Sequence, residues 1–189
     1  MKGEIFNLFE CFISESFGDE TFESILDSAQ PELSTQEPFI GPGTYPDQDF
    51  FSIVKAAINH TGLPLEKAAF LFGKYCFPHL GRKIPGYLNQ FSHPKDFLLT
   101  LDKVIHVEVR KVFKNAEPPE FSYEDPGPNE LIMIYRSKRK LYAFAEGLIQ
   151  GVAEHFQTSI TIQRTIIDME EGQCIFHLKF GTSNEEDGV

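Results

Sequence analysis

The chain has 189 residues, of which 41% are hydrophobic and 24% charged, a composition typical of a folded globular protein and not of a disordered one. Its formal net charge of −11 argues against nucleic acid or an anionic membrane as the main partner. Three cysteines are too few for a disulfide framework, and no apolar run reaches the ~20 residues of a membrane span. We therefore expect a cytoplasmic protein with reduced thiols.

The first part of the sequence predicts helices. Apolar residues at helical spacing predict helices over residues 2–17, 20–29, 47–60 and 64–77. Prolines and glycines predict irregular segments at 30–46 and 78–93. The longest helix is predicted over residues 94–115, with an apolar stripe made of Leu98, Leu101, Ile105, Val109 and Val112.

The pattern changes after Pro118-Pro119. A short extended piece is predicted at 120–123, and strands are predicted at 131–139, 158–168 and 174–180, where apolar and polar residues alternate. Turns are predicted at 125–129 and 170–172, and a helix at 140–156. Helices followed by an antiparallel sheet with one helix across it predict the α+β class.

Tyr135, Ser137 and Arg139 lie at positions i, i+2 and i+4 of a predicted strand, which would point all three side chains to one side. Two hydroxyls and a guanidinium in a row can bind one or two carboxylates or phosphates. The alternative is a solvated strand face with a basic patch.

His106 lies in the most apolar predicted helix, at the edge of its buried face. A neutral imidazole in such a place can be an axial ligand to iron. The alternative is an ordinary core histidine.

Together these features resemble the haem-nitric oxide/oxygen-binding (H-NOX) family. The resemblance consists of His106, the Pro118-Pro119 pair and the Tyr-x-Ser-x-Arg motif at their spacing, and it extends from Met1 to Phe180. The family includes bacterial gas sensors and the haem domain of soluble guanylate cyclase.

The resemblance implies a single domain over residues 1–183, followed by a flexible tail at 184–189. Ferrous haem b would be buried between a helical part, about 1–93, and a part with the ligating helix and the sheet, about 94–183. The residues expected to bind it are His106 as the axial iron ligand, Tyr135, Ser137 and Arg139 at the propionates, and Pro119 and Ile5 pressing on the porphyrin. The 19 phenylalanines suit the walls of such a pocket.

The resemblance also implies a gas preference. The positions expected to line the distal pocket are Phe9, Cys76, Phe144 and Leu148. Oxygen-binding relatives have a tyrosine at the position of Phe144, and Tyr142 would point roughly 200° away from it on a helix. We therefore expect binding of NO and CO and exclusion of O₂.

Some bacterial members of the family hold a structural zinc through four cysteines. The corresponding positions here are Tyr142, Phe144, Ile167 and Cys174. One thiol cannot form a tetrahedral zinc site, so we expect no structural zinc.

The resemblance implies a stand-alone monomeric sensor that is not an enzyme. NO would weaken the bond between iron and His106, and the helices would shift to signal to a separate histidine kinase or cyclic-di-GMP enzyme. Two alternatives remain open: a haem enzyme with peroxidase-like or nitrite-processing activity, and a pocket for another apolar ligand without iron.

Overall fold

The computed structural model describes residues 1–35, 38–112 and 117–181, and these form two compact units. The first unit contains residues 1–68, and the second contains residues 69–112 and 117–181. The boundary between the two units lies near the start of one long helix. The predicted tail at 184–189 lies outside the described residues.

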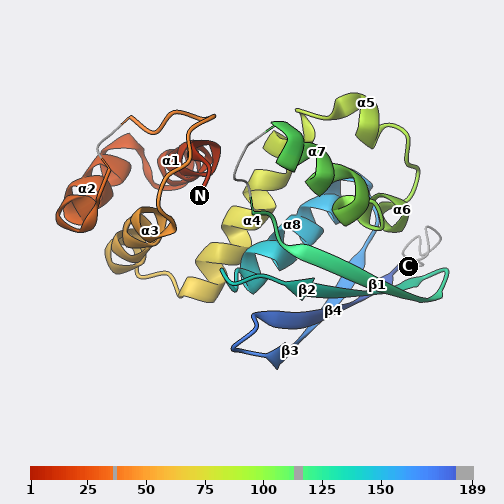
Figure 1. Cartoon of the computed structure of the whole chain (residues 1–189). Coiled ribbons are helices and arrows are strands. Elements are labelled where there is room, and N and C mark those ends of the chain that lie inside the picture. Colours follow the sequence, from red (N-terminus) through yellow and green to blue (C-terminus); the bar gives the residue numbers. More distant parts are fainter. Residues whose placement is uncertain (36–37, 113–116, 182–189) are drawn as a thin grey trace, which may run out of the picture. The chain divides into compact units, whose positions relative to one another are not determined.

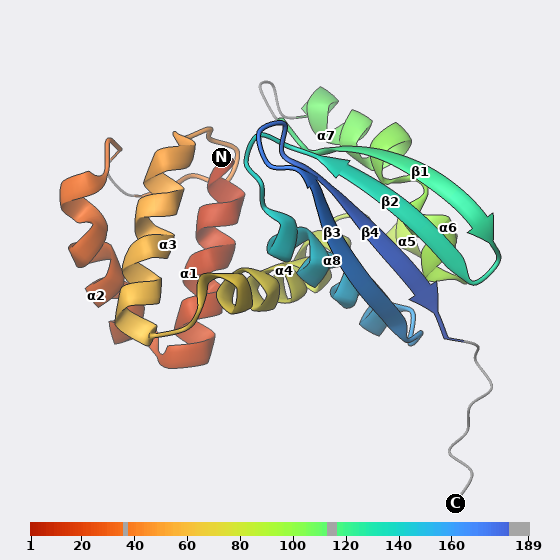
Figure 2. The same cartoon turned by 90° about the horizontal axis from the view of Figure 1, so that it is seen from below.

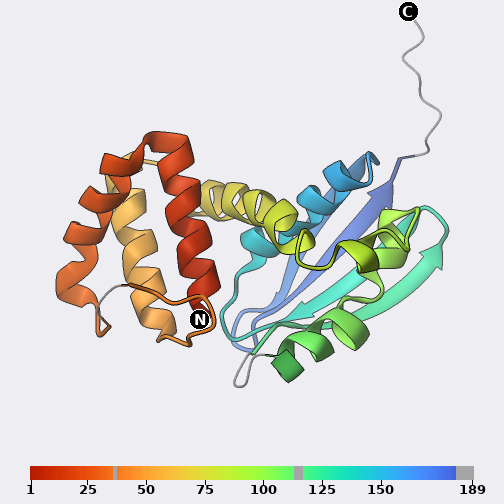
Figure 3. The same cartoon turned by 90° about the horizontal axis from the view of Figure 1, so that it is seen from above.

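The first unit is helical (Figure 3). Its elements are α1 (Gly3–Phe17), α2 (Asp19–Ala29), the 3₁₀ turn η1 (Gln30–Glu32) and α3 (Asp47–Thr61). Each helix buries one apolar face, as the helical spacing predicted. Glycines end α1 and α3, because Gly18 and Gly62 both adopt positive φ angles that other residues rarely take.

A buried carboxylate fastens the loop after η1 to α3. Asp49 is 1% exposed, and it accepts hydrogen bonds from the Ser34 hydroxyl at 2.9 Å and from the Thr35 amide at 3.1 Å. Burial raises the pKa of Asp49, but the hydrogen bonds from Ser34 and Thr35 outweigh it, so the pKa is lowered. The charged carboxylate is therefore the form that stabilises this loop.

The second unit consists of an antiparallel sheet with helices packed against one of its faces (Figure 1). Its helices are α4 (Leu65–Gly81, which starts in the first unit), α5 (Pro85–Leu88), α6 (Pro94–Leu98), the π-helical turn η2 (Leu101–Ile105), α7 (His106–Val112) and α8 (Tyr142–His155). Its strands are β1 (Glu120–Gly127), β2 (Glu130–Arg136), β3 (Ile160–Asp168) and β4 (Gln173–Phe180). The strand order is β1-β2-β4-β3 (Figure 2).

Strict alternation along the two central strands builds the core of this unit. The buried residues that β2 and β4 contribute to this core are Leu131, Met133, Tyr135, Cys174, Phe176, Leu178 and Phe180. Their neighbours in sequence point to the opposite face, as a period of two requires. The α+β class expected from the sequence is therefore confirmed.

The prediction of one continuous helix over residues 94–115 is wrong. It is divided into α6, η2 and α7, and the predicted end at 113–115 lies outside the described residues, as do the side chains of Val109 and Val112. The Thr100 hydroxyl donates to the Phe97 carbonyl at 2.6 Å, and the His106 amide donates to the Leu101 carbonyl, five residues back. A stripe at 98, 101 and 105 fits an α-helix and a π-turn equally, so the sequence could not separate them.

The strand predicted over 131–139 is too long, because β2 ends at Arg136. A turn follows, in which the Lys140 amide donates to the Ser137 carbonyl at 3.1 Å and Lys140 has a positive φ of 53°. Ser137 and Arg139 therefore do not belong to a strand face. β1 in contrast runs further than predicted, through Pro126, which an edge strand tolerates because its outer amides need no partner.

Candidate functional site

His106 is the first residue of α7 and directly follows the π-turn. Its side chain is 14% exposed. The Nδ1 atom is buried and makes no hydrogen bond within the part of the chain that the structure describes. A buried ring nitrogen without a partner is costly, so this nitrogen is available to a bound group.

The surroundings keep this imidazole neutral. Burial lowers the pKa of His106 to about 4, and the charge of Arg110 acts in the same direction. The Asp102 carboxylate and the backbone of Pro119 raise the pKa but do not reverse the shift. A neutral imidazole has a free lone pair, which is the form that ligates a metal ion.

Two groups flank the His106 ring. The Phe121 ring of β1 is stacked with it, with the centroids 5.7 Å apart and the planes inclined by 26°. An oxygen of Asp102 lies 4.0 Å from Nδ1. Neither residue was predicted from the sequence, although the alternation of Phe121 and Tyr123 with polar residues is a signal that places their rings on one face.

Tyr135, Ser137 and Arg139 are close together for a reason other than the one expected. Tyr135 lies on β2 and is 2% exposed, and its hydroxyl interacts with the Ser137 side chain, which lies in the turn. Burial raises the pKa of Tyr135, so its hydroxyl stays a hydrogen-bond donor. The Arg139 amide donates to the Ser137 hydroxyl at 3.3 Å, so a turn and not strand alternation sets this arrangement.

The guanidinium of Arg139 binds the segment just before β1. Its Nη1 donates to the Glu117 carbonyl at 2.5 Å, and its Nη2 lies 3.7 Å from the Glu117 carboxylate. The Arg139 side chain is 21% exposed, whereas that of Glu117 is 81% exposed. An exposed carboxylate is a weak competitor, so the guanidinium can exchange it for another anion.

The predicted distal residues of the second unit lie on two helices that cross closely. Cys76 belongs to α4 and is fully buried, whereas Phe144 and Leu148 belong to α8 and are half-buried. The Phe144 ring packs against Phe72 of α4, with a centroid distance of 5.3 Å. The distal candidates of this unit therefore provide two apolar side chains and a thiol.

The side chain of Tyr142 projects from α8 in a different direction from that of Phe144. Its ring contacts Tyr135, with a centroid distance of 5.6 Å, whereas Phe144 contacts Phe72. Burial and the neighbouring Cys174 raise the pKa of Tyr142. These contacts agree with the expected turn of about 200° between two residues of a helix.

The remaining candidates are divided between the two units. Pro119 directly precedes β1 and is half-buried, and its backbone raises the pKa of His106. Ile5 and Phe9 lie on α1 in the first unit, where Phe9 is buried and Ile5 half-buried. The structure thus brings His106 and Pro119 together within the second unit, and it describes Ile5 and Phe9 as part of the first.

Comparison with known proteins indicates one family. The sequence matches the Haem-NO-binding (HNOB) family over residues 2–164. The H-NOX protein from K. algicida, solved in its Fe(II) unliganded form, is 28% identical, with 97% of this chain and 98% of that chain covered and a TM-score of 0.90. The H-NOX from Shewanella woodyi, solved bound to IWP-051 in the Fe(II)CO state, is 32% identical, with 100% and 99% covered and a TM-score of 0.83.

A curated relative extends the comparison to animals. The soluble guanylate cyclase gcy-31 of Caenorhabditis elegans is 22% identical over 192 residues, which cover 94% of this chain and 25% of the relative. The chain thus spans about a quarter of the length of that protein. It belongs to the Haem-NO-binding, or H-NOX, family of haem-based gas sensors. This confirms the resemblance found in the sequence.

The residues present fit a haem. His106 offers a neutral imidazole with an unsatisfied buried nitrogen, and Tyr135, Ser137 and Arg139 offer donors suited to carboxylates.

Within the described residues, no helix is long and apolar enough to cross a membrane.

Proposed function

We propose that this chain binds ferrous haem b through His106 and senses nitric oxide. The observation that carries the proposal is the buried His106 imidazole, which is held neutral and has no hydrogen bond to Nδ1 among the described residues. Membership of the Haem-NO-binding family supports the same assignment. Ferrous haem held by one histidine supplies an open coordination position for a diatomic gas.

The propionates are assigned to the Tyr135, Ser137 and Arg139 group. Arg139 can offer two parallel N–H donors to a carboxylate, and the hydroxyls of Tyr135 and Ser137 can donate as well. Pro119 and Ile5 are proposed to press on the porphyrin, as the family resemblance implies. No zinc site is proposed.

The distal residues account for the proposed gas selectivity. Bound O₂ is partly anionic and needs a hydrogen-bond donor, whereas NO binds tightly without one. Phe9, Phe144 and Leu148 have no donor, and Cys76 has only a weak one. The protein is therefore proposed to bind NO and CO and to exclude O₂.

His106 is also proposed to start the signal. It begins α7 and is joined through its amide to the π-turn, so its release from the iron would free this segment to move. The chain itself is proposed to have no catalytic activity. The signal is assigned to a separate histidine kinase or cyclic-di-GMP enzyme, which the resemblance to bacterial sensors implies.

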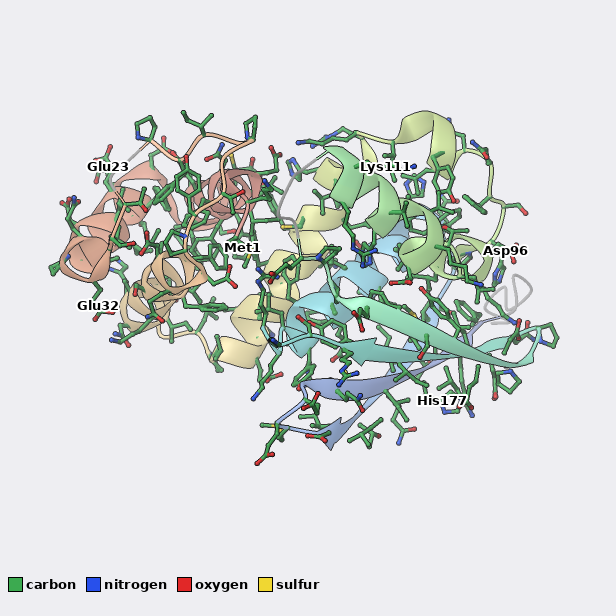
Figure 4. All side chains as sticks on the ribbon, viewed as in Figure 1. Met1, Glu23, Glu32, Asp96, Lys111 and His177 are labelled. Carbon is green, nitrogen blue, oxygen red and sulfur yellow. The ribbon has the colours of Figure 1, made fainter. Side chains whose placement is uncertain are left out.

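Substitution of His106 tests the assignment. We expect His106→Gly to lose haem after purification and to regain it when imidazole is supplied during expression. His177→Gly is the matched control, because His177 lies on the sheet face turned away from the helices (Figure 4). Visible absorption reports loading, and resonance Raman reports the iron–histidine stretching band. An unchanged Soret and stretching band in His106→Gly would show that another residue ligates the iron.

A further inference from the structure

The Phe121 ring packs against one face of the His106 imidazole. The two rings are stacked at 5.7 Å, and Phe121 is itself half-buried on the inward face of β1. An imidazole can rotate about its Cβ–Cγ bond, and a stacked aromatic ring restricts that rotation by its shape and quadrupole. The contact therefore limits the directions in which the ring nitrogens can point.

The backbone of Phe121 is fastened to the same segment. Its amide donates to Asp102 Oδ1 at 3.3 Å, and this oxygen lies 4.0 Å from His106 Nδ1. Asp102 belongs to the π-turn, one turn before His106. One hydrogen bond thus keeps the Phe121 ring in register with the imidazole, because it links β1 to the π-turn.

Phe121 also contacts the proposed propionate group. It pairs with Tyr135 across β1 and β2, and their ring centroids are 5.6 Å apart at an interplanar angle of 68°. The rings of His106, Phe121 and Tyr135 thus form a continuous row inside the second unit. The row joins the proposed iron ligand to the proposed propionate ligand through two aromatic contacts.

We propose that Phe121 is a positioning residue for the haem site: its ring fixes the plane of the His106 imidazole and, through its contact with Tyr135, the orientation of that plane relative to Tyr135. The proposal rests on the proposed function, in which His106 ligates the iron. Orienting groups outside the ligand set commonly change metal affinity by about 10–100-fold when they are removed. Phe121 would act in this way through packing.

The test compares three variants. Phe121→Met conserves apolar volume but removes the aromatic face, and Phe121→Tyr keeps the face. Phe91→Met is the matched control. Phe91 is also half-buried in this unit, but its ring contacts Tyr87 and Phe97 and not His106. Each variant is measured by NMR without haem and by resonance Raman and haem release with haem.

Without haem, we expect the ring-current shift of the His106 ring protons to disappear in Phe121→Met and to remain in Phe121→Tyr and Phe91→Met. With haem, we expect Phe121→Met to broaden and lower the iron–histidine stretching band and to release haem about tenfold faster. Phe121→Tyr should keep the stretching band and the haem release rate of the wild-type protein. Of these readouts, the iron–histidine stretching band follows imidazole orientation, which a loss of stability alone does not change.

Unchanged His106 proton shifts in Phe121→Met, or haem release no faster than in Phe91→Met, would overturn the proposal. Failure of the proposed function has a different signature: the wild-type chain would not take up haem, or His106→Gly would keep its stretching band. In that case the NMR measurement without haem still decides whether the Phe121 ring lies against the His106 imidazole.

Discussion

Arg139 and Glu117 form a contact that the haem propionate would have to replace. The guanidinium is only 21% exposed, and its present partner carboxylate is 81% exposed, so the exchange gives up a weak ion pair for a more shielded one. Removal of one partner of a charge-assisted hydrogen bond costs about 1.5–3 kcal/mol. We therefore expect Arg139→Ala to release haem to an apomyoglobin trap at least tenfold faster, and Ser137→Ala to have a smaller effect.

Arg136→Ala is the control for this prediction. Arg136 lies three residues earlier, is half-exposed and pairs with Glu171. Its loss removes the same charge from the same region without touching the proposed propionate group. Equal release rates for Arg139→Ala and the control would place the propionates elsewhere.

At the scale of a single residue, the proposed gas preference rests on Phe144. It packs against Phe72, so this position presents an apolar ring and no hydrogen-bond donor. We expect the wild-type ferrous protein to form stable NO and CO complexes but no stable oxy spectrum in air, since the proposed distal residues offer bound O₂ no strong donor. We expect Phe144→Tyr to acquire measurable O₂ affinity, read from the visible spectrum during oxygen titration.

The matched control for Phe144→Tyr is Phe72→Tyr, which adds a hydroxyl on the neighbouring helix. A stable oxy spectrum in the wild-type protein would contradict the prediction and would indicate Tyr75 or Tyr142 as the donor.

The crossing of α4 and α8 depends on glycine. A Cβ added at Gly147 would lie 2.0 Å from the Phe70 carbonyl oxygen, and one at Gly73 would lie 2.1 Å from the Phe144 carbonyl oxygen. Backbone atoms cannot move aside as a flexible side chain can, so the helices would have to separate. The helix that carries Phe144 and Leu148 is therefore positioned by residues that have no side chain.

We expect Gly147→Ala to lower the free energy of unfolding by about 1–3 kcal/mol or more, as overpacking does. For a chain of this size, that corresponds to a fall in Tm of roughly 2–4 °C per kcal/mol. Differential scanning calorimetry measures it, with Gly86→Ala as control, because no atom lies within 4 Å of a Cβ added there. A Tm loss no larger than that of the control would show that the helices separate without cost.

At the scale of the whole molecule, haem binding and folding are linked. A ligand that binds only the folded chain adds about 4 kcal/mol when its free concentration is a thousand times its Kd. We expect haem removal to lower the urea midpoint of the wild-type protein and to leave that of His106→Gly unchanged. Equal midpoints with and without haem in the wild-type protein would contradict the proposed binding.

The sequence alone determined the class of the fold and the family. Apolar periodicity depends on local geometry, so it predicted α1, α3, β3 and β4 to within a few residues. The spacing of His106, Pro119 and the Tyr-x-Ser-x-Arg motif identified the family, which the matches to known proteins confirm.

Only the tertiary structure decided how the candidate site is built. The Phe121 amide binds Asp102 of the π-turn, and the Phe121 ring stacks on His106, so β1 meets the ligating segment through contacts between distant parts of the chain. Neither apolar spacing nor β-propensity records such contacts, because one pattern fits an α-helix and a π-turn, and alternation can continue past the last paired residue. Local residue order therefore specified the elements, and long-range packing specified how they orient the imidazole and the propionate donors.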